Sequence, residues 1–258
     1  MILPTEKYSF KLLTACFCGG ADSQTAPAEM RVPSIRGQVR AWHRAVSGED
    51  AVNRVWGSTV GEAGASRVAL ISDASIPPRQ AQPKPHILPH KAQGARPALA
   101  AGQPFTLTLQ RLIGCAPSDW TAAQNAVKLW LLIGGLGLRA NRAAGSVWPV
   151  GKWVPQTSVE LGEILRKLGF PWPVQLVDTP AGTPSDELRR LASDTVKGQP
   201  RFFGDIKPRI PSPTRFKVIE LAGQPRLLVT AGPSVDLMAV RTALSGPNKA
   251  GQYAWQPL

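Results

Sequence analysis

Apolar residues recur along the chain with the two periods that distinguish strands from helices. Alternation of apolar and polar positions predicts strands over residues 1–17, 66–72, 105–112, 146–154, 215–221 and 226–231. A spacing of three to four predicts helices over residues 34–46, 118–133, 158–168, 185–196 and 235–244. The order is strand, helix, strand, strand, helix, loop and strand, followed by a shorter mixed part. This order predicts an α+β protein with an antiparallel sheet.

Residues 76–104 break this pattern, because they are rich in Pro, Gln, Ala, Lys and Arg and lack a sustained apolar period. Proline fixes φ and removes a backbone donor, which disfavours helices and central strands. We therefore expect a Pro-rich insert that forms an exposed, disordered loop.

The helix expected over residues 34–46 has two unlike faces. Ser34 is in place to cap its start, and Ser47 and Gly48 are in place to end it. One face is apolar and consists of Ile35, Val39, Trp42 and Val46. Arg36, Arg40 and Arg44 follow one another at a spacing of four and form a single basic stripe. Such a stripe favours an anion lying across the helix, and the alternative is a solvated charged face.

A glycine-rich loop follows the helix expected over residues 118–133. It contains Gly134, Gly135, Gly137, Gly145, Arg139, Arg142 and Ser146. Glycine permits close backbone approach, and two arginines offer forked donors that match phosphate, so the loop favours an anionic ligand. It lacks the Gly-Lys-Ser/Thr ending of a P-loop and does not follow a strand. The alternative is a turn whose arginines are solvated.

Charge narrows the class of partner. The chain has 30 Lys and Arg against 17 Asp and Glu, a net charge of +13. Hydrophobic residues make up 43% and charged residues 18%, a composition typical of a folded protein. An excess of this size favours a polyanionic partner, with nucleic acid first and an anionic membrane surface second.

The sequence offers little for metal or cofactor chemistry. Cys16 and Cys18 could form half of a zinc site, but no standard spacing completes it, and small apolar residues at a strand end are the simpler interpretation. Asp22 beside Gly19 and Gly20 could hold a metal or act as a base, although such a residue more often caps its own turn. Neither a metal nor a cofactor is predicted. Three cysteines, no secretory signal and no membrane-spanning run favour a cytoplasmic protein.

Three motifs in the same chain order resemble the RAMP superfamily of CRISPR proteins. They are residues 19–44 with 56–68, the glycine loop 134–146, and residues 211–218. The likeness is greatest to subunit one of the type III-B Cmr effector complex. The resemblance implies a ferredoxin-like (RRM-like) fold in two copies. These would be an N-terminal domain over residues 1–155 and a smaller C-terminal domain over residues 156–258.

The resemblance also implies a non-catalytic subunit that binds guide RNA, helps engage target RNA and joins other CRISPR effector subunits. The residues expected to bind RNA lie in the two basic motifs: Arg31, Arg36, Gly37, Arg40, Arg44, Gly134, Gly135, Gly137, Arg139, Arg142, Gly145 and Ser146. Two alternatives stay open. Related subunits cut RNA with an Asp in the loop where Asp22 stands, which implies a metal-dependent RNA endonuclease. The third possibility is a basic scaffold that contacts only proteins.

Overall fold

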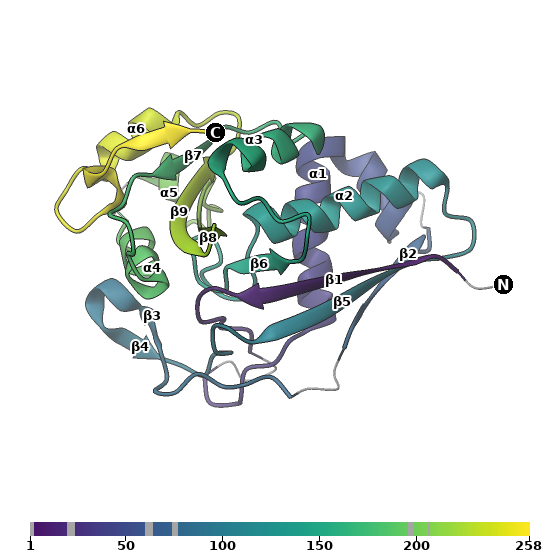
Figure 1. Ribbon diagram of the computed structural model, residues 1–258, viewed down its shortest axis with the longest axis horizontal. Coiled ribbons are helices and arrows are strands. Elements are labelled where there is room, and N and C mark those ends of the chain that lie inside the picture. The colour runs from purple at the N-terminus through teal and green to yellow at the C-terminus, as the bar shows by residue number, and fades with distance from the viewer. Residues whose placement is uncertain (1–2, 20–23, 60–63, 74–76, 196–198, 206) are drawn as a thin grey trace.

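The computed structural model describes residues 3–19, 24–59, 64–73, 77–195, 199–205 and 207–258. The described chain forms two four-stranded antiparallel sheets with helices packed against them (Figure 1). The α+β class predicted from the sequence is confirmed.

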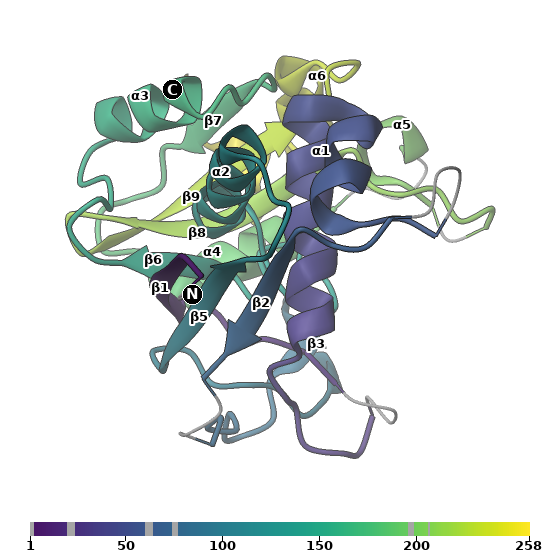
Figure 2. The same cartoon turned by 90° about the vertical axis from the view of Figure 1, so that its right-hand side faces the viewer.

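The first sheet belongs to the first half of the chain and has the strand order β2-β5-β1-β6. Its strands are β1 (Thr5–Leu12), β2 (Val68–Ser72), β5 (Pro104–Arg111) and β6 (Val147–Val150). Along β1 the side chains of Tyr8, Phe10 and Leu12 are buried, while Lys7 and Ser9 are exposed. This alternation gives the sheet one apolar face. The helices α1 (Val32–Trp56) and α2 (Pro117–Ile133) lie side by side over the sheet (Figure 2).

The second sheet belongs to the second half and has the strand order β10-β7-β9-β8. Its strands are β7 (Val174–Val177), β8 (Thr214–Leu221), β9 (Gln224–Ala231) and β10 (Trp255–Pro257). Four helices accompany it: α3 (Ser158–Lys167), α4 (Ser185–Ser193), α5 (Pro200–Phe203) and α6 (Leu237–Ala243). The short elements β7, β10 and α5 have no counterpart among the elements predicted from the sequence.

Both sheets have the same topology. Numbered within its own half, each sheet has the order 2-3-1-4, which is the order of a ferredoxin-like βαββαβ unit. The expectation of two copies of this fold is therefore confirmed. Apolar residues of both halves belong to one continuous core, from Phe10 and Trp130 to Val218 and Leu228. The division into domains at residues 155 and 156 stays a prediction.

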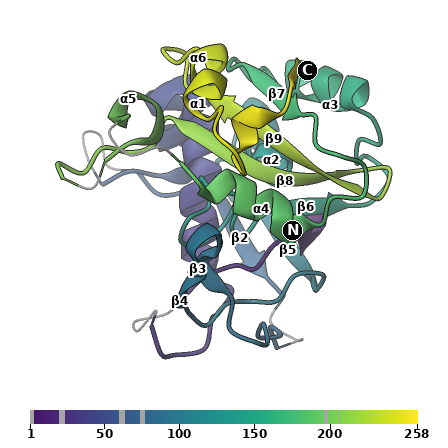
Figure 3. The ribbon, with the colours of Figure 1, turned by 90° about the vertical axis from the view of Figure 1, so that its left-hand side faces the viewer.

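Residues 77–104 are largely exposed or half-buried, as expected, but the expectation of a disordered loop is wrong for the part from residue 86 to residue 95. The chain forms a small hairpin of β3 (His86–Leu88) and β4 (Gln93–Ala95), joined by a 3₁₀ turn η1 (Pro89–Lys91). This hairpin packs against α4 of the second half (Figure 3). The Nδ1 atom of His90 lies 2.8 Å from Oγ of Ser193. The hairpin is therefore stabilised by contacts with α4, which is distant in the sequence, and a periodic apolar pattern within the segment is not needed.

Helix α1 is longer than predicted. The residue before its first turn is Arg31, which makes no side-chain cap, and Pro33 lies in that turn, so Ser34 is not the N-cap. The helix is interrupted at Gly48, whose φ is 78°, but helical geometry resumes and reaches Trp56. Arg54 in the second part forms an ion pair of 2.9 Å with Asp119 of α2. This packing holds the second part after the kink.

Basic side chains connect the two halves. The amine of Lys11 on β1 lies 2.8 Å from the carboxylate of Glu220 on β8. Lys217 is buried on the same strand, and its amine donates a hydrogen bond of 2.5 Å to the carbonyl of Leu131 at the end of α2. Burial lowers the pKa of Lys217 well below its ordinary value. Lys11 and Lys217 therefore stabilise the contact between the two halves.

Within the described residues, none of the helices is both long enough and apolar enough to cross a membrane.

Candidate nucleic-acid interface

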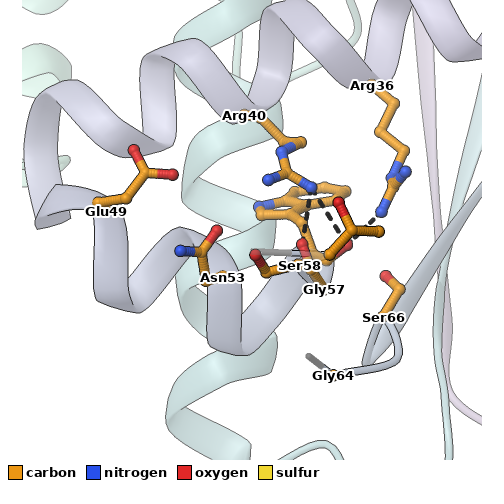
Figure 4. Close-up of a pocket in the computed structure, with 10 residues that line it drawn as sticks. Arg36, Arg40, Glu49, Asn53, Gly57, Ser58, Gly64 and Ser66 are labelled. Atoms are coloured by element: carbon orange, nitrogen blue, oxygen red, sulfur yellow. Dashed lines mark hydrogen bonds between the residues drawn. The ribbon is translucent and has the colours of Figure 1, made fainter. Parts of the chain in front are cut away.

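The kink of α1 creates an open pocket of about 750 Å³ on one side of the helix (Figure 4). The first part of α1 contributes Arg36 and Arg40, and the second part contributes Asn53 and Trp56. The other residues that line the pocket are Glu49, Gly57, Ser58, Thr59, Gly64 and Ser66. Helix α1 thus supplies two walls of the same cavity.

Arg36 and Arg40 reach across the pocket to the end of their own helix. The guanidinium of Arg36 donates to the carbonyl of Trp56. Arg40 donates to the carbonyl of Gly57 at 2.9 Å and lies 3.4 Å from that of Trp56. The last carbonyls of a helix have no intrahelical donor, so basic side chains are suitable partners for them. These contacts fix both guanidinium groups at the rim of the pocket.

Among the described residues that line the pocket, two arginines face one carboxylate, Glu49. Glu49 forms an ion pair with Arg44, which makes a second hydrogen bond to it at 3.1 Å. Arg36 and Arg40 have neutral carbonyls as partners. Burial lowers the pKa of Arg40, the neighbouring charges of Arg36 and Arg44 lower it further, and the charge of Glu49 acts in the opposite direction. An anion in the pocket would relieve this repulsion.

Behind the pocket, Trp56 is held by a buried histidine. Its indole nitrogen donates a hydrogen bond of 2.9 Å to Nδ1 of His43. Burial lowers the pKa of His43 to about 4, so its ring is neutral at neutral pH and Nδ1 can accept. Trp42 is also buried, as its apolar helix face predicted.

Sequence reasoning identified the basic stripe but missed the polar residues opposite it. Asn53, Ser58 and Ser66 lie 9 to 30 positions from Arg44 and Arg36 along the chain. The pattern placed a helix end at Gly48, and only the folded-back second part of α1 brings these residues together. The stretch from Trp56 to Ser58 belongs to the motif that resembles the RAMP superfamily.

Two further residues expected to bind RNA lie near the start of α1. Arg31 is exposed, and its guanidinium lies 3.4 Å from the carboxylate of Glu29. Gly37 is exposed, and a Cβ placed on it would meet nothing within 4 Å. Neither residue lines the pocket.

The glycines of the loop after α2 approach the chain itself. A Cβ on Gly137 would lie 2.7 Å from the carbonyl oxygen of Phe17, and one on Gly145 would lie 2.0 Å from that of Leu136. Gly134 and Gly135 are buried as well, the former against Trp42. The chain itself fills the space beside the backbone of Gly134, Gly137 and Gly145, and RNA binding by the glycines of this loop stays a prediction.

Ser146 is also a structural residue in this fold. It is 1% exposed, and its hydroxyl donates to the carbonyl of Ala143 at 3.0 Å. The same oxygen accepts a hydrogen bond of 3.0 Å from the backbone N–H of Val218 on β8. The hydroxyl of Ser146 therefore joins the glycine loop to β8, and its role in RNA binding stays a prediction.

Arg142 is the central contact of the loop with the second half. It is 6% exposed and donates to the carbonyls of Thr214 and Phe203 and to Oγ of Ser212, each at 3.1 Å. Its guanidinium carbon also lies 5.4 Å from the ring centre of Phe203. Burial lowers the pKa of Arg142 to about 10, so it remains charged at neutral pH. A role in RNA binding stays a prediction for Arg142, whose donors are occupied in the free chain.

Arg139 differs from Arg142. Its side chain is half-buried, and no hydrogen-bond acceptor or carboxylate contacts its guanidinium within the described part of the chain. The backbone of Arg139 has a positive φ of 62°. It is the arginine of the glycine loop whose donors are left for a ligand.

Asp22 lies outside the described residues. Cys16, Cys18 and Cys115 are free thiols in buried positions. Within the described segments, no three His, Cys, Asp or Glu side chains come together in a group that could hold a metal ion.

Comparisons with known proteins point to one family. The model of the RAMP superfamily matches residues 9–148. No curated protein sequence matches the chain. Among solved structures, the chain is similar to apo Cmr1 from Pyrococcus furiosus, with a TM-score of 0.60 and 18% identity over 89% of this chain and 88% of that one.

The chain also resembles subunits in two structures of a type III-B complex, Cmr-beta, bound to cognate target RNA. The TM-scores are 0.58 and 0.53, each at 10% identity. The alignments cover 89% and 92% of this chain and 94% and 97% of the others. At these identities the likeness shows the fold, which is the RAMP fold.

Proposed function

This chain belongs to the RAMP superfamily, and from that premise we propose that it is a non-catalytic RNA-binding subunit of a type III CRISPR effector complex. It holds guide RNA, helps engage target RNA and contacts neighbouring effector subunits. The similar subunits come from structures described as a type III-B complex bound to cognate target RNA, which supports this assignment.

The observation that carries the proposal is the pair of fixed guanidinium groups at the α1 pocket, neither of which forms an ion pair within the described part of the chain. Arg36 and Arg40 are fixed by carbonyl partners, while Glu49, the carboxylate among the described residues that line the pocket, forms its ion pair with Arg44. Forked donors held in place suit phosphate oxygens, and hydroxyl and amide groups opposite them suit the sugar-phosphate backbone. Contacts of this kind tolerate any sequence, as a guide-RNA holder requires.

The test is binding of a guide-length single-stranded RNA across a salt series. We expect tight binding by the wild type and a loss of about 10- to 100-fold in Arg36→Glu/Arg40→Glu. Loss of two phosphate contacts should also reduce the slope of log K against log salt by about 1.4, since a single strand contributes about 0.7 per contact.

The matched control is Arg166→Glu/Lys167→Glu on α3. Both residues are exposed, neither lines the pocket, and the change in net charge is the same. A smaller loss in this control than in the pocket variant supports a local interface. Equal RNA binding by wild type and both variants would contradict the proposal and favour a scaffold that contacts proteins only.

A cleavage assay separates binding from catalysis. We expect intact target RNA in the presence of Mg²⁺, with wild type and Asp22→Ala indistinguishable. Cleavage by the wild type that disappears in Asp22→Ala, with RNA binding retained, would instead establish the metal-dependent endonuclease.

A further inference from the structure

The second part of α1 carries a polar side chain whose hydrogen-bonding groups the fold does not use. Asn53 is half-buried in the pocket wall, and within the described part of the chain its carboxamide makes no hydrogen bond. Asparagine is also a poor helix former, yet Asn53 lies inside the helical segment that ends at Trp56. The helix gains nothing from this residue, and its carboxamide is available to a ligand in the pocket.

Ser58 and Ser66, two other polar residues of the pocket, already make contacts within the chain. The hydroxyl of Ser66 donates a hydrogen bond of 2.6 Å to the carbonyl of Val68. Ser58 exchanges two backbone hydrogen bonds of 3.1 Å with Gly64, which fix this side of the pocket. Of these three residues, Asn53 is therefore the one whose polar side chain has its donors and acceptor free in the described chain.

The fold places Asn53 at the same cavity as two fixed guanidinium groups. Arg36 and Arg40 line the wall made by the first part of α1, and Asn53 lines the wall made by the second part (Figure 4). The interruption of the helix at Gly48 separates the two walls. A cavity of about 750 Å³ is in the range of pockets that hold small molecules and cofactors. A phosphate bound by the arginines therefore has room for its sugar beside Asn53.

The free carboxamide matches a ribose hydroxyl. In RNA the 2′-hydroxyl lies on the carbon next to the one whose oxygen carries the following phosphate, so it accompanies every bound phosphodiester group. A carboxamide has an acceptor oxygen and two donor hydrogens, and a hydroxyl both donates and accepts. DNA lacks this hydroxyl and would leave the carboxamide without that partner.

We propose that Asn53 forms a hydrogen bond with a ribose 2′-hydroxyl of an RNA strand whose phosphate is held by Arg36 and Arg40, so that the α1 pocket selects RNA over DNA. The inference rests on the proposed function, and it adds the residue that determines the kind of nucleic acid bound. The arginines supply affinity that depends on salt, whereas Asn53 supplies discrimination through a neutral contact.

The test measures binding of three single strands that share one guide-length sequence. They are RNA, DNA with uracil in place of thymine, and fully 2′-O-methylated RNA. We expect the wild type to bind RNA about five- to tenfold more tightly than DNA, the effect of one hydrogen bond. The methylated strand should bind like DNA, because methylation removes the hydroxyl donor.

Asn53→Ala should abolish this preference. We expect RNA affinity to fall about five- to tenfold and DNA affinity to stay within about twofold of the wild type. The slope of log K against log salt for RNA should not change, since the lost contact carries no charge. The melting temperature should stay equal or rise, because alanine is the better helix former.

The matched control is Asn125→Ala. Asn125 is also half-buried and lies inside a helix, α2, but it does not line the pocket. Both affinities should remain those of the wild type. An equal loss of RNA affinity in Asn125→Ala and Asn53→Ala would attribute the effect to the helices and overturn the inference.

The remaining outcomes separate this inference from the proposed function. If Asn53→Ala weakens RNA and DNA binding equally, the carboxamide does not recognise the 2′-hydroxyl and the inference is wrong. A reduced salt slope in Asn53→Ala would mean that Asn53 acts by positioning the arginines, which also contradicts it. If Arg36→Glu/Arg40→Glu weakens RNA binding and Asn53→Ala does not, the inference fails and the proposed function stands. If the wild type binds no RNA, both fail.

Discussion

Two arginine-bearing regions of this protein use the same side chain in opposite ways. In the α1 pocket, Arg36 and Arg40 lie at an open cavity and donate to carbonyls of their own helix. In the glycine loop, Arg142 is buried and gives its donors to three residues of the second half. The sequence pattern predicts ligand binding for both regions. The burial of Arg142 and its acceptors in the second half make it part of the fold, whereas the open position of Arg36 and Arg40 is the basis for proposing that they bind a ligand.

The largest expected effect is on Arg142. Arg142→Ala removes the guanidinium donors to the carbonyls of Phe203 and Thr214 and to Oγ of Ser212, and it removes packing against two phenylalanine rings. We expect a loss of about 3–5 kcal/mol in the free energy of unfolding, the usual cost of breaking a buried charged network. Urea denaturation measures it. A loss below about 1 kcal/mol would erase the contrast with the α1 pocket.

Substitution of glycines should change the free energy of unfolding by a smaller amount, with opposite signs in the glycine loop and on α1. Gly145→Ala places a Cβ against the carbonyl of Leu136 in a backbone of positive φ, so we expect about 2–3 kcal/mol of destabilisation. Gly37→Ala on the open side of α1 is the matched control and should stabilise by about 0.5–1 kcal/mol. Thermal unfolding of both variants measures the difference. Equal effects would mean that the loop is not constrained by its own chain.

The smallest expected effect concerns the exposed end of the basic stripe. Arg44 pairs with Glu49, and both side chains are about half exposed, at 46% and 52%. Exposed ion pairs contribute little, so Arg44→Ala should change the free energy of unfolding by less than about 0.5 kcal/mol. It should also free Glu49 to oppose an anion in the pocket and weaken RNA binding modestly. An increase in RNA affinity would show that Glu49 does not act on the bound anion.

The sequence predicted the parts of the fold that depend on local pattern. Alternation located the strand found at Val68–Ser72, and the helical period located α6 and all of α3. Strands β7 and β10 were not predicted, because each has only three or four residues beside prolines and is defined by its pairing with distant strands. The hairpin in the Pro-rich insert was not predicted either, because it packs against α4, a contact that the local sequence does not indicate.

The candidate site likewise has one part that the local sequence predicts and one part that depends on distant contacts. The basic stripe on one face of α1 was predictable, because helical spacing alone brings Arg36 and Arg40 together. The burial of Arg142 was not, since its acceptors lie 61 to 72 residues away along the chain. The net charge of +13 also overstated the charge left for RNA, because Arg142 and Lys217 belong to the core.

The folded-back end of α1 has a consequence for the thermodynamics of association. A free arginine side chain loses up to about 2 kcal/mol of rotamer entropy when a ligand immobilises it. In this pocket the carbonyls of Trp56 and Gly57 already restrict Arg36 and Arg40 before any ligand arrives. Anion binding here should therefore show a smaller entropic penalty than binding to two arginines on an ordinary straight helix.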